Sequence, residues 1–448
     1  MVDISPFVAT RYNQELAGEM SRLVSPPYDV IDRKLQQELH DRHPLNLVRI
    51  DFARPEPTDS EYENQYCRAG ALWQQWKKEG VLVEESRKTY YVYEQRFKLA
   101  DGSRHARRGF FAAVRLEDFA EGGVRAHEQT FAGPKADRFR LMRATHANLS
   151  PIFCVFDDPS RRIDKLLAEA VKGQKPVSAR YDGVEHRLWV VSSPKVINGL
   201  TTQMADQTLF IADGHHRYET SLLYRDKMRE TFGHGNGRSP HDYTMMYLNN
   251  IHDEGLVILP THRILSKETC VGVDCAEAID DMAEFFDVAP LELDKADLEA
   301  EARRYGDLLA EAGRRRPSFI VLLPRGRAWL ATLKPKVDPA ELIDGEELPR
   351  PVLELDVTIL HQYLINRATL GNPEIELDDD DVHYVKDVAD VLRAMTTNRH
   401  GIAYLLNPTR IEQVCEVARE GLRMPHKSTY FYPKLLTGMV MRDMNSPW

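Results

Sequence analysis

A chain of 448 residues is long enough for two or three domains that each bury a hydrophobic core. Hydrophobic residues make up 42% and charged residues 29% of the sequence, a balance that excludes a largely disordered chain. The formal net charge of -10 excludes a chain-wide attraction to nucleic acid or to an anionic membrane, so neither is expected as a partner. Because the sequence contains no signal pattern and no apolar run of about 18 residues, we expect a cytoplasmic protein.

The first half of the chain mixes helical and strand patterns. Residues 61–80 have helical spacing and end on a glycine. Residues 133–149 also have helical spacing. Residues 89–118 alternate between apolar and polar side chains around an Asp-Gly pair, and residues 179–193 repeat this arrangement. Both stretches predict β-hairpins. The first half is therefore expected to be a mixed α/β domain.

A second region begins after the Gly- and Pro-containing stretch at residues 232–243. We place the domain boundary near residue 250, so that residues 1–250 form an N-terminal α/β region and residues 251–448 form a second mixed α/β domain. An apolar run at residues 318–324 predicts a strand in the second domain. Two helical patterns and one strand–turn–helix pattern are also expected there: residues 292–314, 380–396 and 401–421.

The most informative stretch is LFIADGHHRYET, which runs from Leu209 to Thr220. It follows an apolar run and precedes helical spacing, so it is expected on a strand-to-helix turn. Asp213 is a candidate N-cap, and Gly214 lets the main chain approach a ligand closely. The first amides of the helix, together with His215, His216 and Arg217, would bind phosphate there.

A second set of polar residues lies upstream, in the stretch VRAHEQTFAGPKADRFR. His127 and Glu128 are expected in a loop, and Lys135 and Arg138 share one face of the following helix. Glu128 would act as a general base or bind a divalent cation, while Lys135 and Arg138 would neutralise phosphate. The alternative is an amphipathic helix with a solvated basic side.

The stretch MPHKSTYFYPKL near the C-terminus has some features of a phosphate-binding loop. It fails the GxxxxGK[ST] pattern, because His426 stands where glycine is required before Lys427. Lys427, Ser428 and Thr429 are still candidates to contact a ligand. The alternative is a packed surface of Tyr430, Phe431 and Tyr432.

Five markers occur in order along the chain: SPPYDVI from Ser25, HEQTF with the later ANLSPIF, ADGHHRYETSL, ILPTHRI, and MPHKSTYFYPKL. This series resembles the bacterial and archaeal domain of unknown function family 1015, from Pro6 to about Met439. The DGHHR element is also similar to the nucleotide-binding signature of the ParB/sulfiredoxin superfamily, which includes partition CTPases, sulfiredoxin and free-serine kinases. The resemblance implies a ParB/sulfiredoxin-like nucleotide-binding core. Because DGHHR contains no cysteine, sulfinic-acid repair is not expected.

In the kinase members, a glutamate, a Pro-Ile dipeptide and the DGHHR element occur in this order. They match Glu128, Pro151-Ile152 and Asp213 to Arg217. The resemblance implies that Glu128 and Asp213 act around the substrate hydroxyl, and that the histidines and arginine hold phosphates. Candidate contacts to substrate or ligand elsewhere in the markers are Tyr28, Asp29, His127, Lys427 and Thr429.

The leading hypothesis is a nucleotide-dependent phosphotransferase, or kinase, that uses ATP or ADP with Mg²⁺ held through Asp213. Its acceptor would be a small hydroxylated metabolite, for which the resemblance suggests free L-serine. One alternative is a regulatory nucleotide-binding protein without catalysis, which should carry a helix-turn-helix and a basic surface. The other is a metal-dependent phosphohydrolase with His127, Glu128, Asp213, His215 and His216 as ligands. The sequence does not predict an oligomeric state.

Overall fold

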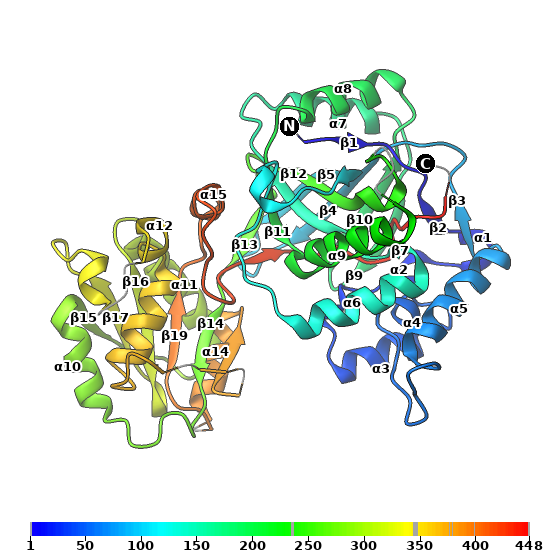
Figure 1. Ribbon diagram of the computed structural model, residues 1–448. Helices are drawn as coiled ribbons and strands as arrows, with labels where there is room; N and C mark the ends of the chain where they lie inside the picture. Colours follow the sequence, from blue (N-terminus) through cyan, green and yellow to red (C-terminus); the bar gives the residue numbers. More distant parts are fainter. Residues whose placement is uncertain are drawn as a thin grey trace. The chain divides into compact units, whose positions relative to one another are not determined.

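The computed structural model describes residues 2–233, 237–343, 348–375, 377–378, 380–397 and 399–446. The chain forms two compact units, Met1–Val257 with Pro433–Trp448, and Ile258–Tyr432 (Figure 1). Both units mix helices and strands, so the mixed α/β class is confirmed. The domain boundary predicted near residue 250 would put the last segment of the chain in the second domain, whereas this segment belongs to the first unit. Local patterns do not reveal such a return, because it depends on contacts between segments that are distant in sequence.

The first unit is built on a nine-stranded mixed sheet with the order β6-β11-β8-β12-β5-β4-β10-β9, and β1 pairs with β5. Both expected hairpins are present in it, as the antiparallel pairs β4–β5 and β9–β10. The strands of this sheet are β1 (Ile4–Ser5), β4 (Tyr91–Lys98), β5 (Arg104–Arg115), β6 (Val124–Arg125), β8 (Ile152–Phe156), β9 (Val177–Tyr181), β10 (Val184–Val190), β11 (Leu209–Asp213) and β12 (Tyr243–Asn250).

Strand β11 is central to the candidate site because of how it pairs. It runs antiparallel to β8, and β8 runs parallel to β12. Asp213, the last residue of β11, lies opposite Phe153 near the start of β8, and the register shifts between Ile211 and Asp213. Such irregularities re-aim side chains at the end of a strand. The carboxyl end of β11 therefore meets the Pro151-Ile152 dipeptide.

Helices cover one face of this sheet. The main hydrophobic core joins strand residues such as Cys154 and Ile211 to Leu167, Leu200 and Tyr218, which come from three different helices. Two further helices extend this layer, because α6 packs on α9 and α5 packs on α6. These helices are α5 (Gln65–Lys78), α6 (Ala132–Thr145), α7 (Arg162–Val171), α8 (Pro194–Met204) and α9 (His215–Phe232). Helices predicted within residues 61–80 and 133–149 are thus confirmed as α5 and α6.

The C-terminal segment is tied to the first unit by main-chain and side-chain contacts. The Gln95 side chain donates a 2.9 Å hydrogen bond to the carbonyl of Lys434, and the buried Arg107 donates to the carbonyl of Pro433. Strand β21 (Arg442–Asp443) then pairs with β7 (Ala147–Asn148). These contacts fix the backbone on both sides of the Lys434 side chain.

The second unit contains a six-stranded antiparallel sheet with the order β15-β17-β16-β19-β14-β18. Alternate residues of β16 enter two different cores, Phe319 and Val321 on one face and Ile320 and Leu322 on the other. Both faces are therefore covered. The strands are β14 (His262–Leu265), β15 (Phe286–Leu291), β16 (Ser318–Leu323), β17 (Arg327–Leu333), β18 (Val382–Val385) and β19 (Ala403–Leu406).

Helices lie on each face of the second sheet. One core includes residues of α10, α13 and α15, and the other includes residues of α11 and α14. The expected strand–turn–helix at residues 401–421 is confirmed as β19 and α15, but the pattern at 380–396 divides into the strand β18 and α14. The helices are α10 (Cys275–Phe285), α11 (Leu298–Gly313), α12 (Arg350–Leu353), α13 (Asp356–Ile359), α14 (Val388–Thr396) and α15 (Ile411–Arg419). Across the described residues, we find no helix with the length and apolar character that crossing a membrane requires.

Candidate functional site

The turn between β11 and α9 has the predicted strand–turn–helix form. Gly214 is the N-cap of α9 with a φ of 96°, in the left-handed region that favours glycine. A Cβ atom at this position would lie 2.9 Å from Nε of Arg217. Asp213 is not the N-cap that the sequence suggests, because Gly214 occupies that position and the Asp213 carboxylate pairs with Arg217 and Lys434 instead. Among the described residues no side chain caps α9, so its first amides are available to an anion.

Asp213 lies between two cations. Its Oδ2 pairs with Arg217, one helical turn along the chain, and its Oδ1 pairs with Lys434 from the C-terminal segment. Burial alone would raise the pKa of Asp213, but Lys434 and Arg217 outweigh it and hold the pKa below its ordinary value. Arg217 also donates to the carbonyl of Pro151. Asp213 is therefore an ionised carboxylate with both oxygens occupied by cations.

Glu128 is linked to α9 through His215. Nδ1 of the buried His215 lies 3.1 Å from Oε2 of Glu128, and Nε2 of the same ring accepts a 3.3 Å hydrogen bond from the N–H of His127. Because Nε2 accepts, the proton of a neutral ring lies on Nδ1 and faces Glu128. Burial would raise the pKa of Glu128, but His215, His127 and Lys434 hold it well below its usual range. The predicted proximity of Glu128 to the DGHHR turn is present in the structure.

His216 and Lys135 lie on the outer side of the same turn. Nε2 of His216 accepts a 2.9 Å hydrogen bond from the N–H of Phe131, and the two rings stack. Lys135 donates a 2.8 Å hydrogen bond to Glu219 of α9. Lys135 thus reaches the helix as expected, but its charge is compensated by Glu219.

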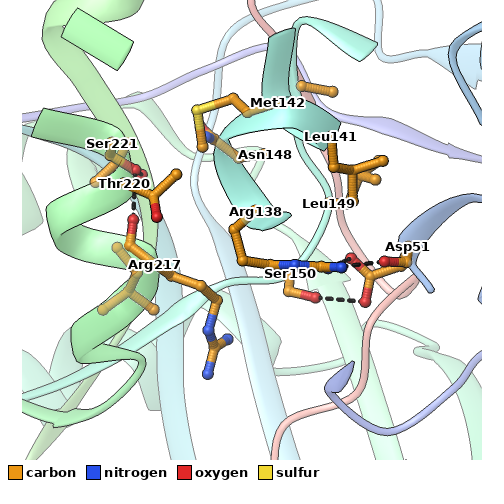
Figure 2. A pocket seen from close by; sticks show the side chains of 13 residues that line it. Asp51, Arg138, Leu141, Met142, Asn148, Leu149, Ser150, Arg217, Thr220 and Ser221 are labelled. Carbon is orange, nitrogen blue, oxygen red and sulfur yellow. Dashed lines mark hydrogen bonds and ion pairs between the residues drawn. The ribbon is translucent and has the colours of Figure 1, made fainter. Parts of the chain in front are cut away.

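Arg138 and Arg217 line one small cavity, of about 40 Å³ (Figure 2). Arg138 donates a 2.7 Å hydrogen bond to the carbonyl of the buried Asp51, and Ser150 donates a 3.1 Å hydrogen bond to the Asp51 carboxylate. The buried hydroxyl of Thr220 also lines the cavity and has no hydrogen-bond partner among the described residues. The volume suits one or two waters or a small polar group and is too small for a nucleotide.

Two other predicted contacts belong to this group, and two lie in the second unit. The Arg138 guanidinium lies 4.1 Å from the centre of the Tyr28 ring, whose pKa is raised to about 12 by burial. Asp29, together with Asp213, raises the pKa of Arg217 against the effect of burial. Lys427 and Thr429 belong to the second unit, and Lys427 accepts a hydrogen bond from Arg263 through its carbonyl.

The residues do not form a metal centre in this arrangement. No group of three or more His, Cys, Asp and Glu side chains that could hold a metal occurs within the parts of the chain that the structure describes. Both Asp213 oxygens are held by Arg217 and Lys434. The donor set therefore does not fit a magnesium ion bound directly by Asp213, nor the ligand set of the phosphohydrolase alternative.

Sequence reasoning missed Lys434, Asp51 and Ser150. Lys434 was visible only as part of the marker MPHKSTYFYPKL, and no spacing rule connects it to Asp213. Asp51 ends the short helix α4 (Val48–Asp51), and Ser150 precedes Pro151 in the marker ANLSPIF. For Lys434 and Ser150, the signal that could have indicated a role in the site was their position inside a family marker.

The chain belongs to the family described as "Protein of unknown function (DUF1015)", whose model matches residues 4–358. No curated protein matches the chain. Among solved structures, it is similar to a free serine kinase in complex with AMP, at 11% identity and a TM-score of 0.30, over 72% of this chain and 86% of that one.

Two further solved structures have comparable scores. A conserved hypothetical protein from Pyrococcus furiosus has 12% identity and a TM-score of 0.31, over 73% of this chain and 92% of that one. SbnI with a C-terminal truncation, from Staphylococcus aureus, has 8% identity and a TM-score of 0.29, over 73% of this chain and 85% of that one. All three are distant neighbours at low TM-scores.

Proposed function

We propose that the first unit is a nucleotide-dependent phosphotransferase that moves a phosphoryl group from ATP or ADP to the hydroxyl of a small metabolite. The observation that carries this proposal is the position of Asp213 between Arg217 and Lys434, at the uncapped start of α9. Phosphoryl transfer depends mostly on positioning and on charge stabilisation, and this cluster offers both.

The phosphates of the nucleotide would bind at the first turn of α9. The amides there carry the positive end of the helix dipole, and Gly214 leaves room for close approach. Arg217 is 10% exposed and Lys434 14% exposed, so their charges are weakly screened by solvent. Asp213 would hold both cations in place rather than act as the base.

Glu128 is the better candidate to accept the hydroxyl proton. Its side chain is 31% exposed, whereas Asp213 is 15% exposed with both oxygens in ion pairs. As the acceptor oxygen forms its bond to phosphorus, the bond from phosphorus to the leaving nucleotide oxygen breaks, and the hydroxyl proton passes to Glu128. A carboxylate with a depressed pKa is a weak base, but a loose transition state demands little proton transfer at its start.

The small cavity beside Arg217 would receive the polar part of the acceptor. The guanidinium groups of Arg138 and Arg217 in its lining are hydrogen-bond donors, and the Asp51 carboxylate is an acceptor. The Thr220 hydroxyl can donate or accept. About 40 Å³ restricts the acceptor to a small group. L-serine is the first acceptor to test, because of the resemblance of the DGHHR element to that of free-serine kinases. Mg²⁺ would accompany the nucleotide phosphates and would not be held directly by Asp213, whose oxygens are paired with Arg217 and Lys434.

The test follows phosphoryl transfer by ³¹P NMR, with ATP or ADP as donor and L-serine, L-threonine, homoserine and glycerol as acceptors. We expect one acceptor to be phosphorylated, and Glu128→Gln to reduce turnover by roughly 100- to 10,000-fold while the nucleotide Kd changes by less than about tenfold. The exposed Glu121, in the same unit, provides the matched control Glu121→Gln. Hydrolysis of the nucleotide without phosphorylation of any acceptor would favour the phosphohydrolase. Nucleotide binding without any turnover would favour the regulatory nucleotide-binding protein.

A further inference from the structure

The second unit has a large pocket at one edge of its sheet. Strands β17 and β19 end at this edge and β16 begins there, since β16 runs antiparallel to both. Helix α11 ends and α15 begins at the same edge, with Gly313, Asn407 and Arg410 among the lining residues. Its volume of about 740 Å³ lies in the range of small-molecule sites.

Five cationic side chains line this pocket, and three of them are accounted for by contacts within the protein. Arg314 pairs with Glu311, Arg316 donates to the carbonyl of Leu333, and Lys334 donates to main-chain carbonyls of α10. The guanidinium groups of Arg315 and Arg410 make no ion pair or hydrogen bond with the described residues. Positive charge therefore remains available in the pocket.

A carboxyl group in the same pocket also lacks a partner. Asp356, in the first turn of α13, makes no side-chain hydrogen bond or ion pair with any described residue, although it faces the charge of Arg410. It is partly buried, and this desolvation raises its pKa to about 7. A desolvated carboxyl group without a hydrogen-bond donor is costly. A ligand with a donor group would remove that cost.

Helix α15 adds a third feature to the pocket. Its N-cap is Arg410, whose N–H donates a 3.1 Å hydrogen bond to the Gln413 side chain. Arg410 and Gln413 both line the pocket. The positive end of the helix dipole thus lies where Arg410 and Arg315 supply positive charge.

We propose that this pocket binds a small metabolite that carries both a phosphate and an ammonium or similar donor group. The phosphate would lie at Arg315, Arg410 and the start of α15, where guanidinium groups can bind it in a fork. The donor group would reach Asp356. This site is separate from the nucleotide site and does not depend on the proposed function of the first unit.

The test measures the binding of phosphoethanolamine and of inorganic phosphate to the full chain by isothermal titration calorimetry. Phosphoethanolamine offers both groups, so it should bind at least about tenfold more tightly than phosphate. Arg410→Gln should weaken phosphoethanolamine by roughly 10- to 100-fold, in line with one charge-assisted hydrogen bond or two. Arg315→Gln provides a second variant, and both arginines are exposed, so folding should be preserved.

Two comparisons make the result specific. Asp356→Asn should abolish the preference for phosphoethanolamine over phosphate, because the negative charge that meets the ammonium is removed. Arg327→Gln is the matched control, since Arg327 is an exposed arginine at the opposite edge of the same sheet. The proposal is overturned if phosphoethanolamine binds wild type and Arg410→Gln equally, or if neither probe binds at millimolar concentration. Phosphate bound in the first unit would be lost in Arg217→Gln and kept in Arg410→Gln.

Discussion

Gly214 connects backbone conformation to side-chain position in the candidate site. Its φ of 96° favours glycine, and a side chain there would press on Arg217. We expect Gly214→Ala to destabilise the first unit by about 1–2 kcal/mol through backbone strain and to weaken nucleotide binding by displacing Arg217. Urea denaturation and calorimetry measure the two effects. Gly183→Ala is the control, because Gly183 has a φ of 73° in open space. Equal nucleotide affinity in both variants would contradict the role given to Gly214.

Asp213→Asn separates charge from shape at the centre of the site. The substitution keeps the size of the side chain but removes the charge that compensates Arg217 and Lys434. We expect a loss of about 3–5 kcal/mol of stability, typical of a broken buried ion pair, and turnover lower by roughly 100-fold, because Arg217 and Lys434 lose the carboxylate that positions them. Nucleotide affinity should stay within about tenfold, because Arg217, Lys434 and the amides of α9 remain.

The control for Asp213→Asn is Asp118→Asn, which removes a 63% exposed carboxylate from the same unit. Melting temperature, nucleotide Kd and turnover are measured on both variants. An Asp213→Asn protein with wild-type turnover would place the chemistry outside this cluster.

At the scale of elements, the sequence predicted the parts that depend on local physical chemistry. The Asp-Gly pairs indicated both hairpins, because the positive φ angles of Gly102 and Gly183 suit tight turns. The change of periodicity after Asp213 indicated the β11–α9 turn. The split of residues 380–396 into β18 and α14 was not predicted, since four strand residues give too short a pattern to separate from a helix.

Helix α13 offers a pH-dependent test of the second unit. The pKa of Asp356 is raised to about 7 by burial, while in the unfolded chain the same carboxyl group has its ordinary pKa of 3.8. The folded state therefore binds the proton more tightly, and Asp356 costs stability progressively as pH rises from about 4 to 7. We expect Asp356→Asn to raise the melting temperature at pH 8 and to have little effect at pH 4.

Asp338→Asn gives a comparison of opposite sign. A hydrogen bond from Arg350 lowers the pKa of Asp338, so its contribution to stability is present above the unfolded pKa and is lost on acidification. Because Asp338 is exposed, the change in melting temperature should be small. A melting temperature of Asp356→Asn that differs from wild type equally at pH 4 and pH 8 would show that Asp356 is not a buried acid.

At the scale of the whole molecule, the chain leaves the first unit after Val257 and returns to it at Pro433. This return brings Lys434 to Asp213, although the two residues are 221 positions apart in sequence. Patterns within a window of the sequence predicted Asp213, Arg217 and Glu128 as site residues, but not Lys434, the fourth charged residue of the cluster. Sheet pairing and main-chain contacts made by the returning segment decide that partner, and these do not follow from periodicity or motif spacing.

The most direct test of the account is the binding of ADP and ATP to the full chain by isothermal titration calorimetry. We compare wild type with Arg217→Gln and Lys434→Gln, and use Lys227→Gln as the control, because it removes one exposed charge from the same helix α9. The account predicts one nucleotide per first unit, a Kd raised at least about tenfold in Arg217→Gln and Lys434→Gln, and an unchanged Kd in Lys227→Gln. Folded Arg217→Gln and Lys434→Gln proteins that bind nucleotide as tightly as wild type, or a wild-type protein that binds none, would contradict it.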